Sequence, residues 1–89
     1  MAFHLSGTIT VPPNDLERVL AALADHILLT RAEPGCRSFS VEEKENGVFL
    51  VSEEFIDRAA FEAHQVRLRE TPWAAASVNA VRNYKTWET

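Results

Sequence analysis

Apolar and polar residues alternate at the start of the chain. This period of two predicts a strand from Phe3 to Val11 with one buried face. Pro12 follows, and because proline cannot donate a hydrogen bond to a strand ladder, we expect the strand to end there. The side chains expected on the buried face are Phe3, Leu5, Ile9 and Val11.

A helical period of apolar residues replaces the alternation after the prolines. It predicts a helix that ends near Ala32, since Pro34 and Gly35 cannot continue it. We expect Asn14 to cap the helix, with Glu17 three residues later in the spacing of a capping box. The expected buried face is Leu16, Val19, Leu20, Leu23 and Ile27.

The middle of the chain is predicted to form a β-hairpin. Strands over Arg37–Lys44 and Val48–Ile56 flank an Asn46-Gly47 pair, which is typical of a tight type I′ turn with two positive φ angles. The second strand carries apolar residues on both faces. A strand of this kind belongs in the middle of a sheet.

The last part of the chain predicts two helices and a strand. Asp57 is expected to cap a helix whose apolar face includes Phe61 and His64. A Thr-Pro pair predicts a separate short helix over Pro72–Ser77. Residues Asn79–Trp87 alternate as a final strand.

The predicted order is β-α-β-β-α-β. It indicates an α+β, ferredoxin-like domain spanning residues 1–89, with a four-stranded antiparallel sheet and both helices on one face. Right-handed crossovers place the first and third strands centrally. Because the other face also receives large apolar residues, we expect a second copy of the chain to cover it, giving a homodimer.

The composition of the chain argues against several classes of function. The net charge of −4 argues against sequence-independent binding of nucleic acid, which needs a basic face. No apolar run is long enough to span a membrane, and the first residues lack a secretory signal pattern. The single cysteine, Cys36, cannot form an internal disulfide, and we expect a cytoplasmic protein. The three histidines and one cysteine lack metal-ligand spacing, so no metal site is expected.

Four segments carry a family resemblance: Glu33–Cys36, Glu53–Phe55, Asp57–His64 and Trp73. The chain resembles the antibiotic biosynthesis monooxygenase domain family, particularly its small quinol-monooxygenase-like members. The resemblance implies a dimeric α+β barrel with a cavity between sheet and helices in each subunit. It also implies oxygenation of a small aromatic or quinol by molecular oxygen without metal, flavin or haem.

The resemblance makes His64 the expected catalytic base or proton relay, since an imidazole titrates near neutrality. Its alternative role is structural, at a helix face. The expected substrate-binding residues are Phe61, Trp73, Tyr84, Asn83, Glu54 and His4. Each of them also has a plain structural explanation, as a core, interface or edge-strand residue.

Two interpretations of Glu54 stay open: a buried carboxylate near His64 that raises the pKa of the imidazole, or a solvated cross-strand partner. His26 is expected at the surface, and Cys36 is expected to be a small strand residue rather than a nucleophile. Two alternatives to an oxygenase stay open. One is a non-catalytic small-molecule-binding or stress-response protein on the same barrel. The other is a haem binder or haem-degrading enzyme with His64 as axial ligand.

Overall fold

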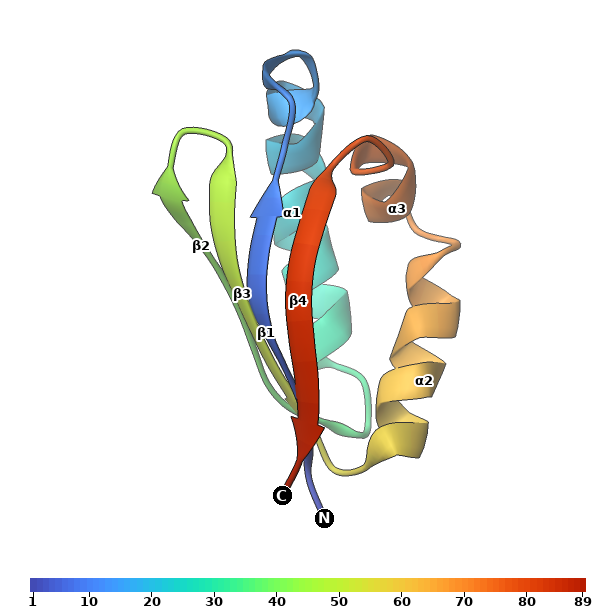
Figure 1. Ribbon diagram of the computed structural model, residues 1–89. Coiled ribbons are helices and arrows are strands. Elements are labelled where there is room, and N and C mark those ends of the chain that lie inside the picture. The colour runs from blue at the N-terminus through green and yellow to red at the C-terminus, as the bar shows by residue number, and fades with distance from the viewer.

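The computed structural model describes all residues 1–89 and contains four strands and three α-helices (Figure 1). The elements are β1 (Phe3–Thr10), α1 (Leu16–Arg31), β2 (Cys36–Glu45), β3 (Val48–Phe55), α2 (Arg58–Leu68), α3 (Pro72–Ala76) and β4 (Val81–Glu88). A 3-10 turn over Pro13–Asp15 precedes α1. This order confirms the α+β ferredoxin-like prediction. None of the helices combines the length and apolar character needed to cross a membrane.

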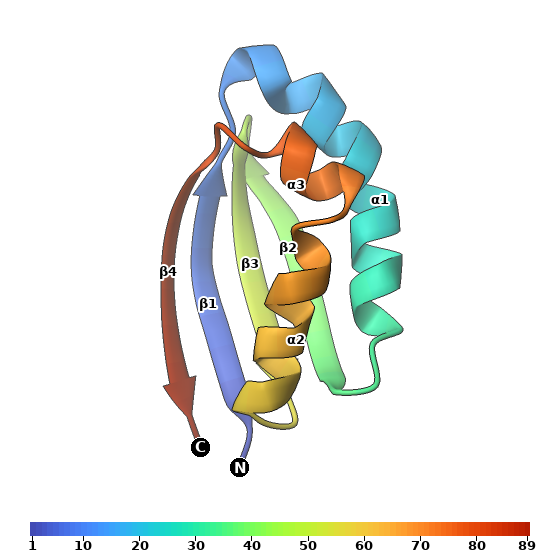
Figure 2. The ribbon, with the colours of Figure 1, turned by 90° about the vertical axis from the view of Figure 1, so that its right-hand side faces the viewer.

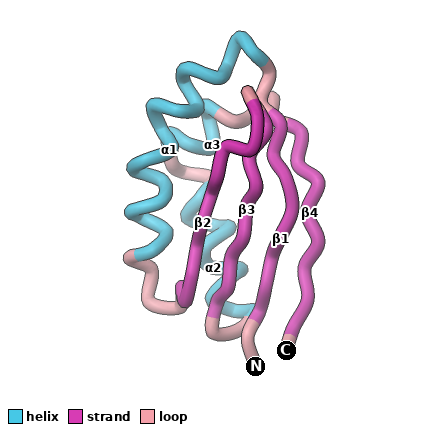
Figure 3. The backbone as a smooth tube through the Cα atoms, turned by 90° about the vertical axis from the view of Figure 1, so that its left-hand side faces the viewer, coloured by secondary structure: helices cyan, strands magenta, loops and turns pink.

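The strands form one antiparallel sheet in the order β2-β3-β1-β4, so β1 and β3 are central as predicted. All three helices lie on one face of the sheet, and the opposite face carries no helix (Figures 2 and 3). The two chain ends lie side by side, where the Thr89 amide donates to the Ala2 carbonyl at 3.0 Å (Figure 1).

The hydrophobic core fills the space between the sheet and the helices. Val19 of α1 and Phe49 of β3 are almost completely buried there. At Gly7 the neighbouring strand comes so close that a Cβ atom would lie 2.1 Å from the carbonyl oxygen of Asn83. Only glycine therefore allows β4 to pair at this point. The core residues are Leu5, Ile9, Val11, Val19, Phe49, Val51 and Trp73.

The two helix caps predicted from sequence have different outcomes. Asp57 caps α2, because its Oδ1 accepts a hydrogen bond from the Ala60 amide at 2.8 Å. The Asn14 prediction is wrong: Asn14 lies inside the 3-10 turn, and α1 begins one residue after Asp15. The Asp15 carboxylate does not cap the helix, because it accepts hydrogen bonds from Arg18 and Asn79.

The predicted type I′ turn in the hairpin is also wrong. Gly47 has a φ of +83°, but Asn46 does not have the positive φ that this turn requires at its first position. The cause is the surroundings of the turn. Strand pairing shifts between Glu43 and Glu45, and the Gly47 carbonyl accepts a hydrogen bond from the Val11 amide at 2.7 Å.

The uncovered sheet face is mixed rather than uniformly apolar. Leu50 and Trp87, each 41% exposed, are among its large apolar side chains. Between them runs a cross-strand row of small or polar residues, in which Ser52 pairs with Ser40 on one side and Ser6 on the other. The expectation of bulky apolar residues on this face therefore holds only for part of it.

Candidate functional site

A small cavity of about 150 Å³ lies between the inner sheet face and the helices. Phe39, Trp73 and Tyr84 contribute aromatic rings to its wall, and Leu5, Val41, Val51 and Leu68 complete the apolar part of the lining. The polar lining residues are His26, His64 and Gln65 on the helix side and Glu53 and Arg82 on the sheet side. A mostly apolar cavity with a few polar groups is typical of small-molecule sites.

His64 lies on α2, and only 2% of its surface is exposed. Its Nδ1 lies 2.9 Å from Oε1 of Glu33, in the loop that follows α1. The second oxygen of Glu33 accepts a hydrogen bond from Arg67 Nε at 3.0 Å. The carboxylate is thus held by two side chains of the same helix, one turn apart, and in turn it fixes the imidazole ring.

The pair determines which nitrogen of His64 is free. A carboxylate only accepts hydrogen bonds, so Nδ1 carries the proton, and Nε2, which has no hydrogen bond to the protein, presents a lone pair. Burial lowers the pKa of His64 below its ordinary value of 6.5, and this effect outweighs the opposing charge of Glu33. A neutral imidazole with a free lone pair can accept a proton at neutral pH.

His26 contradicts the expectation that it lies at the surface. It is 6% exposed and stacks on Trp73 with a centroid separation of 4.6 Å and an interplanar angle of 1°. Its ring centroid lies 6.1 Å from that of His64. Burial, followed by the charge of His64, lowers the pKa of His26 to about 4, so the ring is neutral. His26 recurs with the buried residues Val19 and Thr30 at the spacing of one helix face, and this spacing indicates that its side chain points toward the sheet.

Glu53 is a cavity residue that the sequence reasoning missed. It is 8% exposed, and its Oε1 has no hydrogen-bond partner. Burial, with a smaller contribution from the charge of Glu33, raises the pKa of Glu53 to about 7. The alternation along β3 contained the signal, because Glu53 shares a face with Val51 and Phe55, which are both buried.

The structure brings three of the predicted residues to one cavity, whereas Phe61 does not line it. His64, Trp73 and Tyr84 line the cavity. Burial raises the pKa of Tyr84 to about 12, so its phenol stays protonated. Phe61 packs against Phe3, with ring centroids 4.6 Å apart, and belongs to the packing around the cavity.

Glu54, His4 and Asn83 lie on the opposite face of the sheet, away from this cavity. The interpretation of Glu54 as the carboxylate beside His64 is wrong, because successive side chains of a strand point to opposite faces and Glu54 points away. Its alternative as a cross-strand partner agrees with the structure, where Glu54 Oε2 lies 3.4 Å from Arg37 Nη1 on β2. His4 stacks on Trp87 with ring centroids 5.0 Å apart, and its Nδ1 lies 3.9 Å from Glu54.

A groove of about 480 Å³ borders the cavity at the C-terminal part of α1 and along α2. His26 and His64 line both spaces, and Glu33 and Arg67 lie along the groove. No cluster of three or more His, Cys, Asp or Glu side chains is arranged to hold a metal ion. Burial raises the pKa of the Cys36 thiol, so it is held in the unreactive form.

Solved structures with the same fold come from several bacteria. A candidate antibiotic biosynthesis monooxygenase from Nitrosomonas europaea superposes with a TM-score of 0.77 at 17% identity, over 100% of this chain and 98% of that one. Another, from Deinococcus radiodurans, gives a TM-score of 0.73 at 21% identity, over 100% and 92%. Rv0793 from Mycobacterium tuberculosis gives 0.75 at 20% identity, over 100% and 95%. At these identities the likeness shows the fold alone.

No curated protein matches the sequence. The family model for antibiotic biosynthesis monooxygenase matches residues 2–67, which include β1 through most of α2 and therefore Glu33, Glu53 and His64. The match covers well over half of the chain, and it agrees with the fold. The chain belongs to the antibiotic biosynthesis monooxygenase family.

Proposed function

We propose that the protein is a cofactor-independent monooxygenase that acts on a small aromatic or quinol substrate, with His64 as the base. The observation that carries this proposal is the His64–Glu33 pair, in which a neutral imidazole held by a carboxylate lines a cavity with aromatic walls. Family membership supports the reaction class.

The chemistry needs little from the protein. His64 Nε2 accepts a phenolic proton, and the resulting electron-rich ring transfers an electron to oxygen and then combines with it. For 1,4-hydroquinone the balance is one quinol and one O₂ giving one hydroxyquinone and one water. The substrate supplies all four electrons that reduce O₂, two in the hydroxylation of the ring and two in the oxidation of quinol to quinone, so no external reductant enters. The O–O bond breaks as one oxygen atom stays on the ring and the other leaves as water, which takes up the two protons released by the substrate. Glu33 orients the imidazole and stabilises the imidazolium that forms, while the apolar wall excludes water.

The haem alternative has a size problem. A porphyrin carries four pyrrole rings, whereas the cavity of about 150 Å³ accommodates roughly one aromatic ring, so haem would have to bind His64 from the neighbouring groove of about 480 Å³. A non-catalytic binding role on the same scaffold predicts that no oxygen is consumed in the following test.

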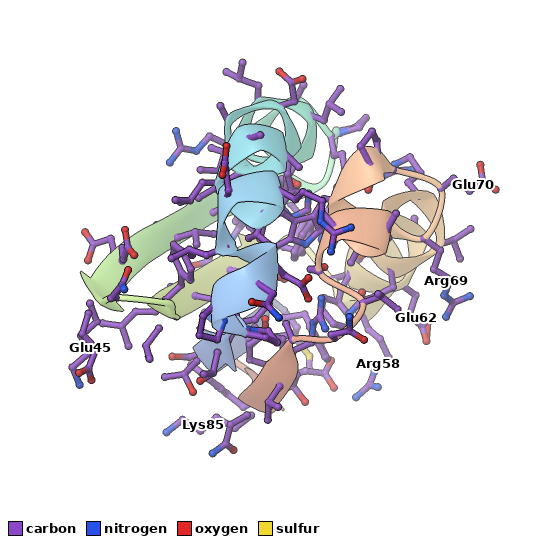
Figure 4. All side chains as sticks on the ribbon, turned by 90° about the horizontal axis from the view of Figure 1, so that it is seen from above. Glu45, Arg58, Glu62, Arg69, Glu70 and Lys85 are labelled. Carbon is purple, nitrogen blue, oxygen red and sulfur yellow. The ribbon has the colours of Figure 1, made fainter.

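The test is oxygen uptake with 1,4-hydroquinone, followed together with hydroxyquinone and peroxide by chromatography. We expect equal consumption of oxygen and quinol without peroxide, and a loss of roughly 10²–10⁴-fold in kcat in His64→Ala. Glu62→Gln is the matched control, because Glu62 projects from α2 into solvent (Figure 4). Full turnover in His64→Ala, with native thermal stability, contradicts the role of His64. Peroxide as the product contradicts a monooxygenase.

We also propose that the protein works as a cytoplasmic homodimer, in which the uncovered faces of two sheets pack together. The exposed apolar side chains on that face, among them Leu50 and Trp87, support this arrangement. The single cysteine, Cys36, fits a reducing compartment. Sedimentation equilibrium is expected to give twice the chain mass of 10.0 kDa, and Leu50→Lys is expected to shift the protein toward the monomer. A wild-type monomer at micromolar concentration contradicts the dimer.

A further inference from the structure

Glu53 is a buried carboxyl group for which the base chemistry of His64 has no use. We propose that Glu53 anchors a hydroxyl group of a single-ring aromatic substrate inside the cavity, on the wall opposite His64. The inference deepens the proposed function and rests on it, since it specifies which aromatic compounds the site accepts.

The first argument is the missing hydrogen-bond partner. Glu53 lies on the inner face of a central strand, between Phe39 on one neighbouring strand and Leu5 on the other. Its Oε1 is buried and unpartnered, although buried polar atoms nearly always find a partner. Arg82 also lines the cavity, but its guanidinium donates to the Ser77 hydroxyl at 2.8 Å. No protein group therefore satisfies this oxygen, and a ligand hydroxyl in the cavity would.

The second argument is the chemistry of the two walls. The sheet side offers the Glu53 carboxyl, and the helix side offers the Nε2 lone pair of His64. A ring with hydroxyl groups at opposite positions can donate one hydrogen bond to each wall. The aromatic rings of Trp73 and Phe39 then contact the apolar part of such a ligand.

The third argument is size. A cavity of about 150 Å³ with apolar walls is comparable to an engineered protein cavity that binds benzene, and lies below the range usual for drug-sized ligands. One ring fits inside the cavity, whereas a fused ring system has to extend into the neighbouring groove and away from Glu53. The structure therefore points to monocyclic phenols and hydroquinones rather than to polycyclic aromatic compounds.

The test measures binding and involves no oxygen chemistry. Phenol, toluene and 1-naphthol are titrated into the protein by calorimetry under nitrogen. Toluene replaces the hydroxyl of phenol by a methyl group of similar size. We expect phenol to bind at least about tenfold more tightly than toluene or 1-naphthol, because only phenol both fits and satisfies Glu53. Glu53→Leu is expected to reduce the preference for phenol over toluene by roughly three- to tenfold, the worth of one hydrogen bond, while His64 Nε2 still accepts from phenol. The exposed control Glu62→Gln is expected to keep the full preference (Figure 4).

A second measurement does not depend on any variant. With ¹³C-labelled protein, phenol is expected to shift the side-chain carboxyl resonance of Glu53, and toluene is expected to leave it in place. Equal affinity for phenol and toluene in the wild type, an unchanged preference in a folded Glu53→Leu variant, or an unmoved resonance overturns the proposal. Oxygen uptake does not enter these readouts, so a protein that selects phenol through Glu53 but consumes no oxygen refutes the proposed function alone.

Discussion

Replacing Glu53 by glutamine should change how the stability of the protein depends on pH. Burial raises the pKa of Glu53 from 4.5 to about 7. At about 1.36 kcal/mol per pH unit, this difference corresponds to about 3 kcal/mol of folding free energy at pH values above 7. A glutamine side chain has nearly the same shape as the glutamate but no proton to release.

The direction of the effect follows from proton binding. Between pH 4.5 and about 7 the unfolded chain has already released the Glu53 proton while the folded protein keeps it. The folded state therefore binds more protons, and stability falls as the pH rises through this window. Below pH 4.5 both states are protonated and the penalty disappears. Above about pH 7 the penalty is complete and constant.

The assay is guanidinium unfolding of the wild type and Glu53→Gln at intervals from pH 4 to pH 8.5. The variant's free energy of unfolding, relative to the wild type, is expected to rise by about 3 kcal/mol across this range, which is about 12 °C or more in Tm for a domain of this size. Burying the glutamine amide in place of the carboxyl group adds a cost that does not depend on pH. This cost shifts the whole curve of the stability difference against pH but does not change its slope. The exposed control Glu62→Gln should give a flat curve (Figure 4). A flat curve for Glu53→Gln as well would refute the reasoning, because Glu53 would then titrate normally in the fold.

Three other changes have expected outcomes. His26→Phe should reduce by about 3 kcal/mol the loss of folding free energy on acidification from pH 6.5 to 4. Burial and the charge of His64 lower the pKa of His26 to about 4, so in this pH range the unfolded chain binds a proton that the folded protein does not. Thermal unfolding of the variant and the wild type at both pH values measures the difference. Gly7→Ala should cost about 3 kcal/mol or more by urea unfolding, since its Cβ would meet the Asn83 carbonyl at 2.1 Å, while Thr10→Ala at the exposed end of β1 stays near zero. Glu33→Gln should lower the pKa of His64 further in an NMR titration, because the carboxylate charge that raises it is gone; an unchanged pKa contradicts the orienting role of Glu33.

The sequence predicted the fold well because periodicity records which side of each element is buried. The apolar residues on both faces of β3 indicated a central strand, and the sheet order β2-β3-β1-β4 confirms it. The same alternation placed Glu53 on the inner face, although it was not interpreted in that way. Local chemistry also sufficed for Asp57, whose cap involves only its own helix.

Two local predictions failed, at the cap of α1 and at the hairpin turn. Asn14 lies inside a 3-10 turn and not at the cap of α1, and the residue at the cap position, Asp15, bonds elsewhere. Asp15 bonds Asn79, which is 64 positions away along the chain, and the helix starts after a 3-10 turn. The Asn46-Gly47 turn adjusts to a hydrogen bond between Gly47 and Val11 of another segment. Local propensity is weak next to such tertiary contacts.

The sequence by itself determined the element order, the central strands and the family, and it predicted a site with His64, Trp73 and Tyr84, three residues that line the same cavity. Only the tertiary structure decided which carboxylate serves His64. Glu33 lies 31 positions earlier in the chain, and it reaches the imidazole because α2 packs beside the loop that follows α1. Periodicity specifies the inward face of an element, but the side chains that meet across that face depend on how the elements pack against each other.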